Sequence, residues 1–249
     1  MAYLVHLAQQ GAAYIHPLGA SATTQLLVML EVRPGNRILE IGCGTGSTLA
    51  LAAQAHAAQF TGIDLLPAML QAARPRVRSL RNVCLAQANG VHLPLASDVY
   101  DRVYTESVLG FQTALDTRAM LAEIFRVLKP RGRYLANEAI WKTTVDASVA
   151  ARINALSLRD FGLRPASELP WHVDEWLTLM LATGFCVRSA DLLIPTKGFT
   201  RSSSWLKWLK IFLRPHLLAP ALYYRRRLRA HQDEGKYLEA RLFVLEKPV

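Results

Sequence analysis

Three glycines at alternate positions, Gly42, Gly44 and Gly46, follow a short apolar run that carries one carboxylate, Glu40. Glycines in such a turn let the backbone adopt positive φ, and they let a ligand approach without meeting a Cβ atom. The apolar run, Arg37 to Ile41, predicts a buried parallel strand, and the alanine-rich run after the glycines predicts a helix. The first N–H groups of that helix have no partners within it. The pattern therefore predicts a polar-ligand site where the first strand ends.

Polar residues follow later apolar runs in the same way. Asp64 ends the run Gln59 to Asp64, Asn89 follows the next run, and Glu106 ends the fourth. Ligands of open α/β sheets bind at the carboxyl ends of the strands, where an acid about twenty residues past the glycines can accept from ribose hydroxyls. We expect Asp64 to bind a ribose, with helix capping as its other reading.

The spacing of the glycines disfavours a dinucleotide. A dinucleotide turn has the pattern G-x-G-x-x-G, whose last glycine opens the helix against a pyrophosphate. Here the pattern is Glu-x-Gly-x-Gly-x-Gly, and Ser47 stands where that last glycine would be. The turn suits a ligand of another shape.

From Arg37 to Ile140 the chain resembles the class I S-adenosylmethionine (SAM)-dependent methyltransferases, especially the ubiquinone/menaquinone, sterol and tocopherol group. The resemblance includes the glycine turn, the acid Asp64, the Leu-Pro pair after Asn89, and the Leu-Lys-Pro-x-Gly segment that ends at Gly132. The chain departs from the family at Ala88, where Gly is more usual. It also departs at Gly110-Phe111, where many relatives have a His, so no catalytic His is carried over at that position.

The resemblance implies SAM as the cofactor. Gly42, Gly44 and Gly46 would frame its methionine end, and Glu40 would reach the amino group. The side-chain oxygen of Asn89 would accept from the amino group of the adenine, and the backbone N–H of Gly90 would donate to a ring nitrogen. Further cofactor contacts are expected from Cys43, Leu65, Met69, Thr105 and Glu106.

Two residues are candidates for the chemical step. Glu106 ends a central strand, and sterol and tocopherol methyltransferases carry a Glu in a similar place. We expect it to face the acceptor as a general base or as an anchor, with a surface acid as the alternative. His16 lies in the N-terminal leader, which in the resembled family folds over the cofactor; its alternative role is to cap the turn before Pro17.

Strand and helix patterns alternate along the chain, and the last apolar run, Tyr237 to Glu246, alternates as an antiparallel strand would. The predicted fold is α/β, with a Rossmann-like, seven-stranded, mostly parallel sheet, helices on both faces and an antiparallel last strand. We expect a single methyltransferase domain over residues 1–249. It has an N-terminal helical lid at 1–34, a SAM-binding core at 37–140 and a helical cap inserted at 195–236.

Composition narrows the class of protein further. The 249 residues have a formal net charge of +10, which is compatible with nucleic acid, with anionic membrane, or with a merely solvated basic surface. The three cysteines show no metal-ligand spacing, so no metal site is expected. The absence of a signal-peptide pattern and of a long apolar run predicts a cytoplasmic protein.

The segment before the last strand carries most of the membrane signal. Residues 205–213 predict an amphipathic helix with Trp205 and Trp208 on or beside its apolar face and lysines opposite, and an arginine-rich stretch follows at 225–229. This pattern is typical of an interfacial helix. We expect peripheral contact with anionic membrane through 201–229, or a cap that packs on its own domain, or both.

The predicted function is methyl transfer from SAM to a small, hydrophobic acceptor in small-molecule biosynthesis. Three alternatives stay open. An RNA methyltransferase fits the charge but lacks a base-methylation motif, a SAM-binding scaffold would keep the fold without chemistry, and a nicotinamide oxidoreductase is disfavoured by the glycines. The sequence does not distinguish carbon, nitrogen and oxygen as the methylated atom.

Overall fold

The computed structural model describes residues 2–16, 18–194 and 217–249. The strands are β1 (Arg37–Ile41), β2 (Gln59–Asp64), β3 (Val83–Gln87), β4 (Tyr100–Glu106), β5 (Leu128–Trp141), β6 (Cys186–Leu192) and β7 (Leu238–Glu246). The helices are α1 (Ala2–Gln9), α2 (Ala20–Leu30), α3 (Ser47–Ala55), α4 (Pro67–Val77), α5 (Ala114–Val127), α6 (Ala147–Phe161), α7 (Val173–Ala182) and α9 (Leu218–Ala230). Two short 3-10 helices are η1 (Leu109–Phe111) and η3 (Glu234–Tyr237).

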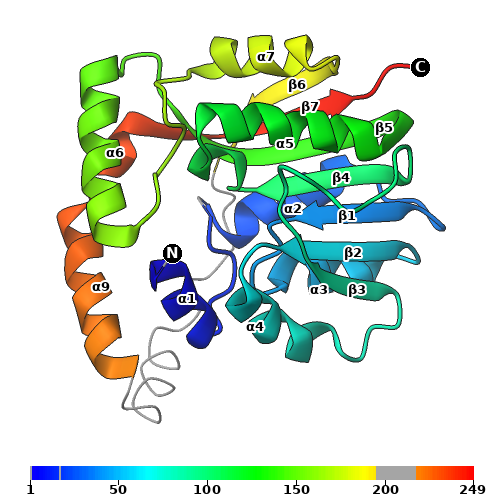
Figure 1. Ribbon diagram of the computed structural model, residues 1–249, viewed down its shortest axis with the longest axis horizontal. Helices are drawn as coiled ribbons and strands as arrows, with labels where there is room; N and C mark the ends of the chain where they lie inside the picture. Colours follow the sequence, from blue (N-terminus) through cyan, green and yellow to red (C-terminus); the bar gives the residue numbers. More distant parts are fainter. Residues whose placement is uncertain (1, 17, 195–216) are drawn as a thin grey trace.

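The strands form one seven-stranded sheet in the order β3-β2-β1-β4-β5-β7-β6. The pairs among β1 to β5 are parallel, whereas β7 runs antiparallel to both β5 and β6 (Figure 1). The chain winds outward from β1 to β3 on one side and continues from β4 on the other. This topology confirms the predicted fold class, and it places a switch point between β1 and β4.

Apolar side chains of alternate strand residues fill two layers, because successive residues of a strand point to opposite faces. On one face, Leu39 and Val103 pack with the inner sides of α5 and α7. On the other face, Ile38 and Tyr104 pack with α2 and α3. The glycine-rich turn lies at the carboxyl end of β1, between these layers.

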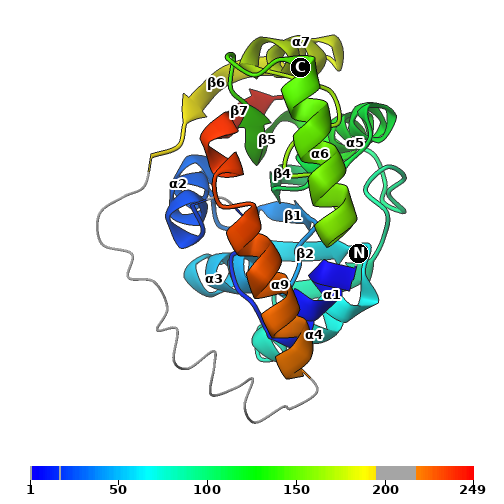
Figure 2. The same ribbon diagram turned by 90° about the vertical axis from the view of Figure 1, so that its left-hand side faces the viewer.

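The helices α1, α6 and α9 gather beyond the carboxyl ends of the parallel strands (Figures 1 and 2). The ring of Tyr3 on α1 lies 5.0 Å from that of Phe161 on α6 and 4.9 Å from that of Tyr224 on α9, measured between centroids. The imidazole of His231 just after α9 bonds the carboxylate of Asp160 on α6 at 2.9 Å. These contacts join α1, α6 and α9 beyond the carboxyl edge of the parallel strands.

The ends of two helices are well defined. Helix α1 ends at Gln9, and Gly11 takes a positive φ of 62°. Helix α5 is capped by Thr113, whose hydroxyl accepts from the backbone N–H of Asp116. The predicted amphipathic helix at 205–213 lies outside the described residues.

Candidate active site

A pocket opens at the carboxyl ends of β1, β2 and β4, beside the switch point and against the N-terminal segment. It contains about 690 Å³ of space, part of it open to solvent. Its walls come from the glycine turn, the ends of β2 and β4, and residues 4–16. The residues used below are Leu4, Ile15, His16, Glu40, Gly42, Cys43, Gly44, Thr48, Asp64, Leu66, Met69, Glu106, Ser107, Val108 and Phe111.

The three glycines of the turn have different roles. Gly44 has φ of 52°, and a Cβ atom built on it would meet nothing within 4 Å, because the position faces open space. A Cβ on Gly42 would lie 2.5 Å from a methyl carbon of Val108, and one on Gly46 would lie 2.9 Å from Cβ of Ala73. Gly44 therefore keeps the pocket open, whereas Gly42 and Gly46 allow close packing behind it.

Asp64 is buried at the end of β2 and holds the glycine turn in place. Its Oδ2 accepts from the backbone N–H of Gly44 and its Oδ1 from that of Leu66, both at 2.8 Å. Each carboxylate oxygen keeps a second lone pair, so two further hydroxyl donors can bind from the pocket. Asp64 does not cap α4, whose N-cap residue is Leu66.

The pocket is acidic. Its described lining includes the carboxylates Glu40, Asp64 and Glu106 but no Lys or Arg. Burial raises the pKa of Glu40 well above its usual range, and the nearby charges of Glu106 and Asp64 add to the shift, although the hydroxyl of Tyr104 donates to Glu40 at 2.8 Å. Negative charge concentrated in a low-dielectric site favours a cationic ligand and opposes an anionic one.

Glu106 and His16, predicted separately, lie together. The Nε2 atom of His16 is 3.1 Å from Oε2 of Glu106, and both side chains are buried. Glu106 also accepts from the hydroxyls of Thr23 at 2.9 Å and Thr48 at 2.7 Å, and from the amide of Asn137 at 3.1 Å. Glu106 is therefore not a surface acid, and its immediate partners are polar groups.

Thr23, Thr48 and Asn137 were not predicted as site residues. Thr23 lies on α2, Thr48 in the first turn of α3, and Asn137 on β5 beside the end of β4. Thr23 and Thr48 are polar residues on the inner side of otherwise apolar helices, and this was a usable signal. Only the packing of α2 and α3 on the sheet shows that both residues converge with Asn137 on one carboxylate.

Several residues predicted to contact the cofactor do not line the pocket. The prediction for Thr105 is corrected here, because strand alternation turns its hydroxyl to the opposite face of the sheet from Glu106. There it bonds the hydroxyl of Tyr134 at 2.8 Å. Leu65 is half exposed, and Leu66 lines the pocket in its place. Asn89 and Gly90 are not among the lining residues. Contacts of Asn89 and Gly90 with an adenine stay a prediction.

Glu138 on β5 is a buried carboxylate that no motif in the sequence singles out. It accepts from three consecutive backbone N–H groups, those of Val108 and Leu109 at 3.0 Å and of Gly110 at 3.2 Å. Burial raises its pKa to about 7, although these hydrogen bonds act in the opposite direction. Glu138 thereby fixes the turn after β4 that carries Ser107, Val108 and Phe111 into the site.

Comparison with known proteins identifies this constellation. Residues 38–132 match the family model described as a methyltransferase domain. An uncharacterized methyltransferase of Bacillus subtilis, YodH, is 31% identical over 194 residues, which are 78% of each chain. This chain belongs to the methyltransferase family. The predicted class I SAM-dependent methyltransferase is thereby confirmed at the level of family, fold and cofactor.

Two further relatives match over shorter stretches. Methyltransferase GfsG of Streptomyces halstedii is 31% identical over 67% of this chain and 58% of its own length. A demethylmenaquinone methyltransferase of Tropheryma whipplei is 36% identical over 44% of each. The chain thus spans only about half the length of these two relatives.

Solved structures show the same fold over nearly the whole chain. The [4+2]-cyclase SpnF superposes with a TM-score of 0.72 and 19% identity, covering 99% of this chain and 92% of its own. A geranyl diphosphate methyltransferase in complex with GPP and sinefungin superposes with a TM-score of 0.65 and 19% identity, covering 92% and 78%.

The residues present fit SAM. The cofactor carries a sulfonium and an ammonium, which match the three carboxylates and the absence of Lys and Arg from the described lining. Asp64 offers unused lone pairs to two ribose hydroxyls, and Glu40 offers a carboxylate oxygen to the amino group. The open space beside Gly44 leaves room for the methionine part of the cofactor.

Asp64→Ala is expected to weaken SAM binding by about 1.5–3 kcal/mol, because it removes charged hydrogen bonds to two hydroxyls and also releases the N–H of Gly44. Isothermal titration measures the change. Asp98→Asn, which alters an exposed acid outside the pocket lining, is the control and should bind SAM like the parent. Parent-like affinity in Asp64→Ala would contradict the ribose assignment.

The raised pKa of Glu138 predicts a pH-dependent stability. Because the folded state binds this proton more tightly than the unfolded chain, stability is present at low pH and is lost as pH rises from 4.5 through about 7. The shift corresponds to about 3 kcal/mol. Glu138→Gln should remove this decline from urea-unfolding free energies measured between about pH 5 and pH 8.

The control for this measurement is Glu123→Gln. The pKa of Glu123 is lowered, chiefly by the guanidinium of Arg126, so it does not titrate in this window and its loss should leave the decline unchanged. His231, whose pKa is raised, contributes a decline of the same sign. The difference between parent and Glu138→Gln is therefore the relevant quantity, and equal slopes in the two proteins would refute the prediction.

Proposed function

We propose that this methyltransferase transfers a methyl group from SAM to a small, largely apolar acceptor. The acidic pocket with no basic residue in its described lining carries this proposal, because it suits a cationic cofactor and opposes the phosphates of a dinucleotide. Leu4, Ile15, Val108 and Phe111 supply apolar walls beside the carboxylates. The relative named for demethylmenaquinone agrees with an acceptor of this kind.

SAM supplies a methyl group activated by its sulfonium. The protein aligns the reactants, which lowers the entropic part of the barrier. Asp64 holds the ribose, Glu40 accepts from the amino group, and the glycine turn supports the methionine end. Glu106 and His16 lie in the same pocket, and for an acceptor that must lose a proton this pair takes it up, as a general base requires.

We further propose that residues 1–34 close over the cofactor held by 37–140. The guanidinium of Arg76 on α4 donates to the backbone oxygens of Gly11 and Thr45, which ties the leader to the glycine turn. None of the described residues of the 195–236 segment lines the pocket. Its helix α9 contacts α1 through Tyr224, so this part of the segment supports the lid and does not face the acceptor directly.

Isothermal titration with SAM and with its demethylated product, followed by a methyl-transfer assay on a metabolite extract, tests the proposal. Tight binding of both ligands is expected, together with a mass increase of one CH₂ unit in an extract component, because methylation replaces a hydrogen atom with a methyl group. Binding without transfer would favour the alternative of a SAM-binding scaffold. The fold neighbour SpnF, which is named a cyclase, shows that a protein with this fold can be named for another activity. Transfer to added RNA in the same assay would favour the RNA methyltransferase alternative.

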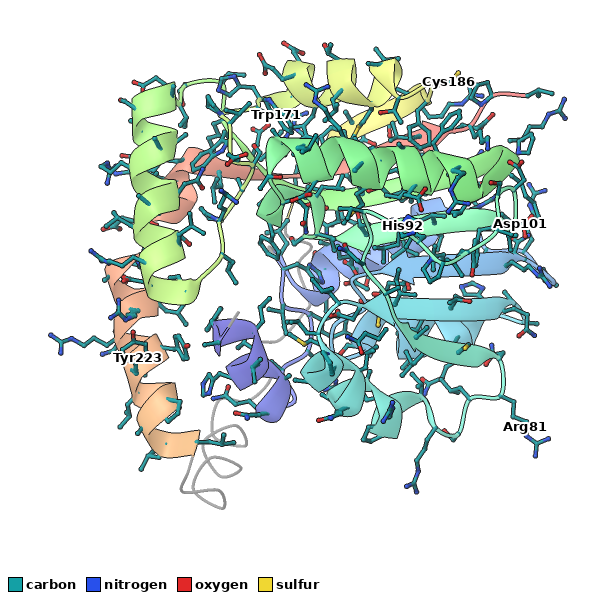
Figure 3. The ribbon with its side chains drawn as sticks, in the orientation of Figure 1. Arg81, His92, Asp101, Trp171, Cys186 and Tyr223 are labelled. Carbon is teal, nitrogen blue, oxygen red and sulfur yellow. The ribbon has the colours of Figure 1, made fainter. Side chains whose placement is uncertain are left out.

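Contact with anionic membrane is a separate proposal. Helix α9 exposes Leu222, Tyr223 and Leu228 next to the exposed arginines Arg226 and Arg229, and Tyr223 is labelled on this helix in Figure 3. Such a surface binds anionic headgroups electrostatically and places apolar side chains at the interface. None of the helices in the described ranges combines the length and hydrophobicity that a transmembrane span requires.

Liposome flotation checks this contact. The parent should float with anionic vesicles at low salt, bind less as added salt shortens the Debye length, and bind several-fold less in an Arg226/Arg229→Gln double variant. Arg81→Gln, an exposed arginine at the far side of the molecule, is the control (Figure 3). A parent protein that stays in the soluble fraction at low salt would end the membrane proposal.

A further inference from the structure

A second, smaller pocket adjoins the cofactor pocket, on the side of the turn after β4. It contains about 260 Å³ of space. Its walls are Ile15, Ser107, Gly110, Phe111, Glu138, Ala139 and Pro165. Three of these residues, Ile15, Ser107 and Phe111, also line the first pocket, so the two pockets share a wall. Apart from Ser107 and Glu138, the lining side chains are apolar.

The hydroxyl of Ser107 has no hydrogen-bond partner within the described residues, although the residue is only 6% exposed. Its position is set by the backbone: its N–H donates to the carbonyl of Asn137 at 2.7 Å, and its φ is 53°, an uncommon conformation for a residue with a Cβ. Buried hydroxyls are nearly always hydrogen-bonded, so an unpartnered one that lines a pocket indicates a missing ligand atom.

The two oxygens of Glu138 differ in how many donors they meet. Oε1 accepts from the N–H groups of Val108 and Leu109 and from the hydroxyl of Thr105. Oε2 accepts only from the N–H of Gly110 among the described residues, at 3.2 Å. A carboxylate oxygen can accept two hydrogen bonds, so Oε2 keeps one acceptor site in a pocket that Glu138 lines.

We propose that Ser107 and Glu138 form a subsite that binds a hydroxyl group of the methyl acceptor, which is therefore an apolar molecule bearing an alcohol or phenol. This inference rests on the proposed function. A hydroxyl donates to Oε2 of Glu138 and accepts from the hydroxyl of Ser107, so it satisfies both groups at once. An ammonium would leave the Ser107 proton without an acceptor, and a carbonyl oxygen would face the carboxylate without a proton to donate.

Phenol and toluene are the probes, because they share the ring and differ in the hydroxyl. Saturation-transfer NMR titrations use the full chain saturated with S-adenosylhomocysteine, the demethylated product. The parent should bind phenol at least about tenfold more tightly than toluene, since the hydroxyl pairs with two buried polar groups that toluene leaves without partners. Glu138→Gln should remove most of this preference, and Ser107→Ala should reduce it about threefold.

Ser189→Ala, which removes a hydroxyl on β6 bonded to Asp191, is the matched control and should keep the preference. Thermal unfolding checks that Glu138→Gln is folded, and Ser107→Ala removes a side-chain oxygen that no described residue uses. With S-adenosylhomocysteine bound, equal binding of both probes, binding of neither, or a preference unchanged in both variants would overturn the subsite while leaving the cofactor assignment intact. Failure of S-adenosylhomocysteine itself to bind would overturn both proposals.

Discussion

Gly44→Val is expected to abolish SAM binding, with a loss of at least about 100-fold in affinity, or about 3 kcal/mol. Gly44 faces open space in the pocket, and we propose that the methionine end of the cofactor lies there against the backbone. A valine side chain would fill that space. The variant also places a β-branched residue at φ of 52°, which costs about 1–2 kcal/mol of backbone strain.

Gly35→Val separates these two effects. Gly35 lies in the turn before β1, has φ of 81°, and a Cβ there would likewise meet nothing within 4 Å, but it does not line the pocket. Both variants should lose stability in thermal unfolding, and only Gly44→Val should lose SAM in isothermal titration. If Gly44→Val binds SAM like the parent, or if Gly35→Val loses it equally, the assignment of the glycine turn is wrong.

Glu106→Gln is expected to reduce turnover about 100-fold while changing SAM affinity little, because a positioned base contributes about 10²–10⁴-fold to rate. The substitution keeps the size of the side chain but replaces one acceptor oxygen with a donor. That donor would face the hydroxyl and amide donors of Thr23, Thr48 and Asn137 and the ring of His16. Steady-state kinetics with the acceptor, together with titration of SAM, measure the two quantities separately.

Asp101→Asn is the control for Glu106→Gln. Asp101 lies at the opposite end of the same strand, where it bonds Lys129 and the backbone of Arg37 (Figure 3). A general weakening of β4 would affect both variants, whereas a role in the site affects only Glu106→Gln. His16→Ala should share the low turnover if the pair acts as one unit. A normal turnover in Glu106→Gln with the true acceptor would assign Glu106 a structural role only.

The fold, and the convergence of the glycine turn and Asp64 on one pocket, were predictable because they depend on local patterns. A buried parallel strand is a short apolar run, and a tight turn into a helix needs glycine, so Arg37 to Gly46 could be interpreted from residue types alone. Asp64 followed from the same logic, since a residue that ends a parallel strand must lie at the ligand-binding edge. The structure adds that Asp64 also fastens the turn through Gly44.

The surroundings of Glu106 depended on the tertiary structure. Its partners come from α2, α3, β5 and the N-terminal leader. Two of these partners, His16 and Asn137, also contact each other although 121 residues separate them in the sequence. Glu138 was not predicted because its neighbours in sequence show no motif; only the register of β5 beside β4 sets it under the turn at Val108 to Gly110. Thr105 was misplaced because strand alternation, and not proximity in sequence to Glu106, decides which face a side chain takes.

The sequence by itself therefore determined the sheet, the glycine turn and the acidic residue that ends β2, because each is encoded within a few neighbouring residues. Tertiary structure alone decided which polar groups meet around Glu106, that α9 contacts α1 and does not line the pocket, and that Ser107 and Glu138 share a second pocket. Those relations join residues far apart along the chain. Their distances are set by how helices pack on the sheet, which no local pattern encodes.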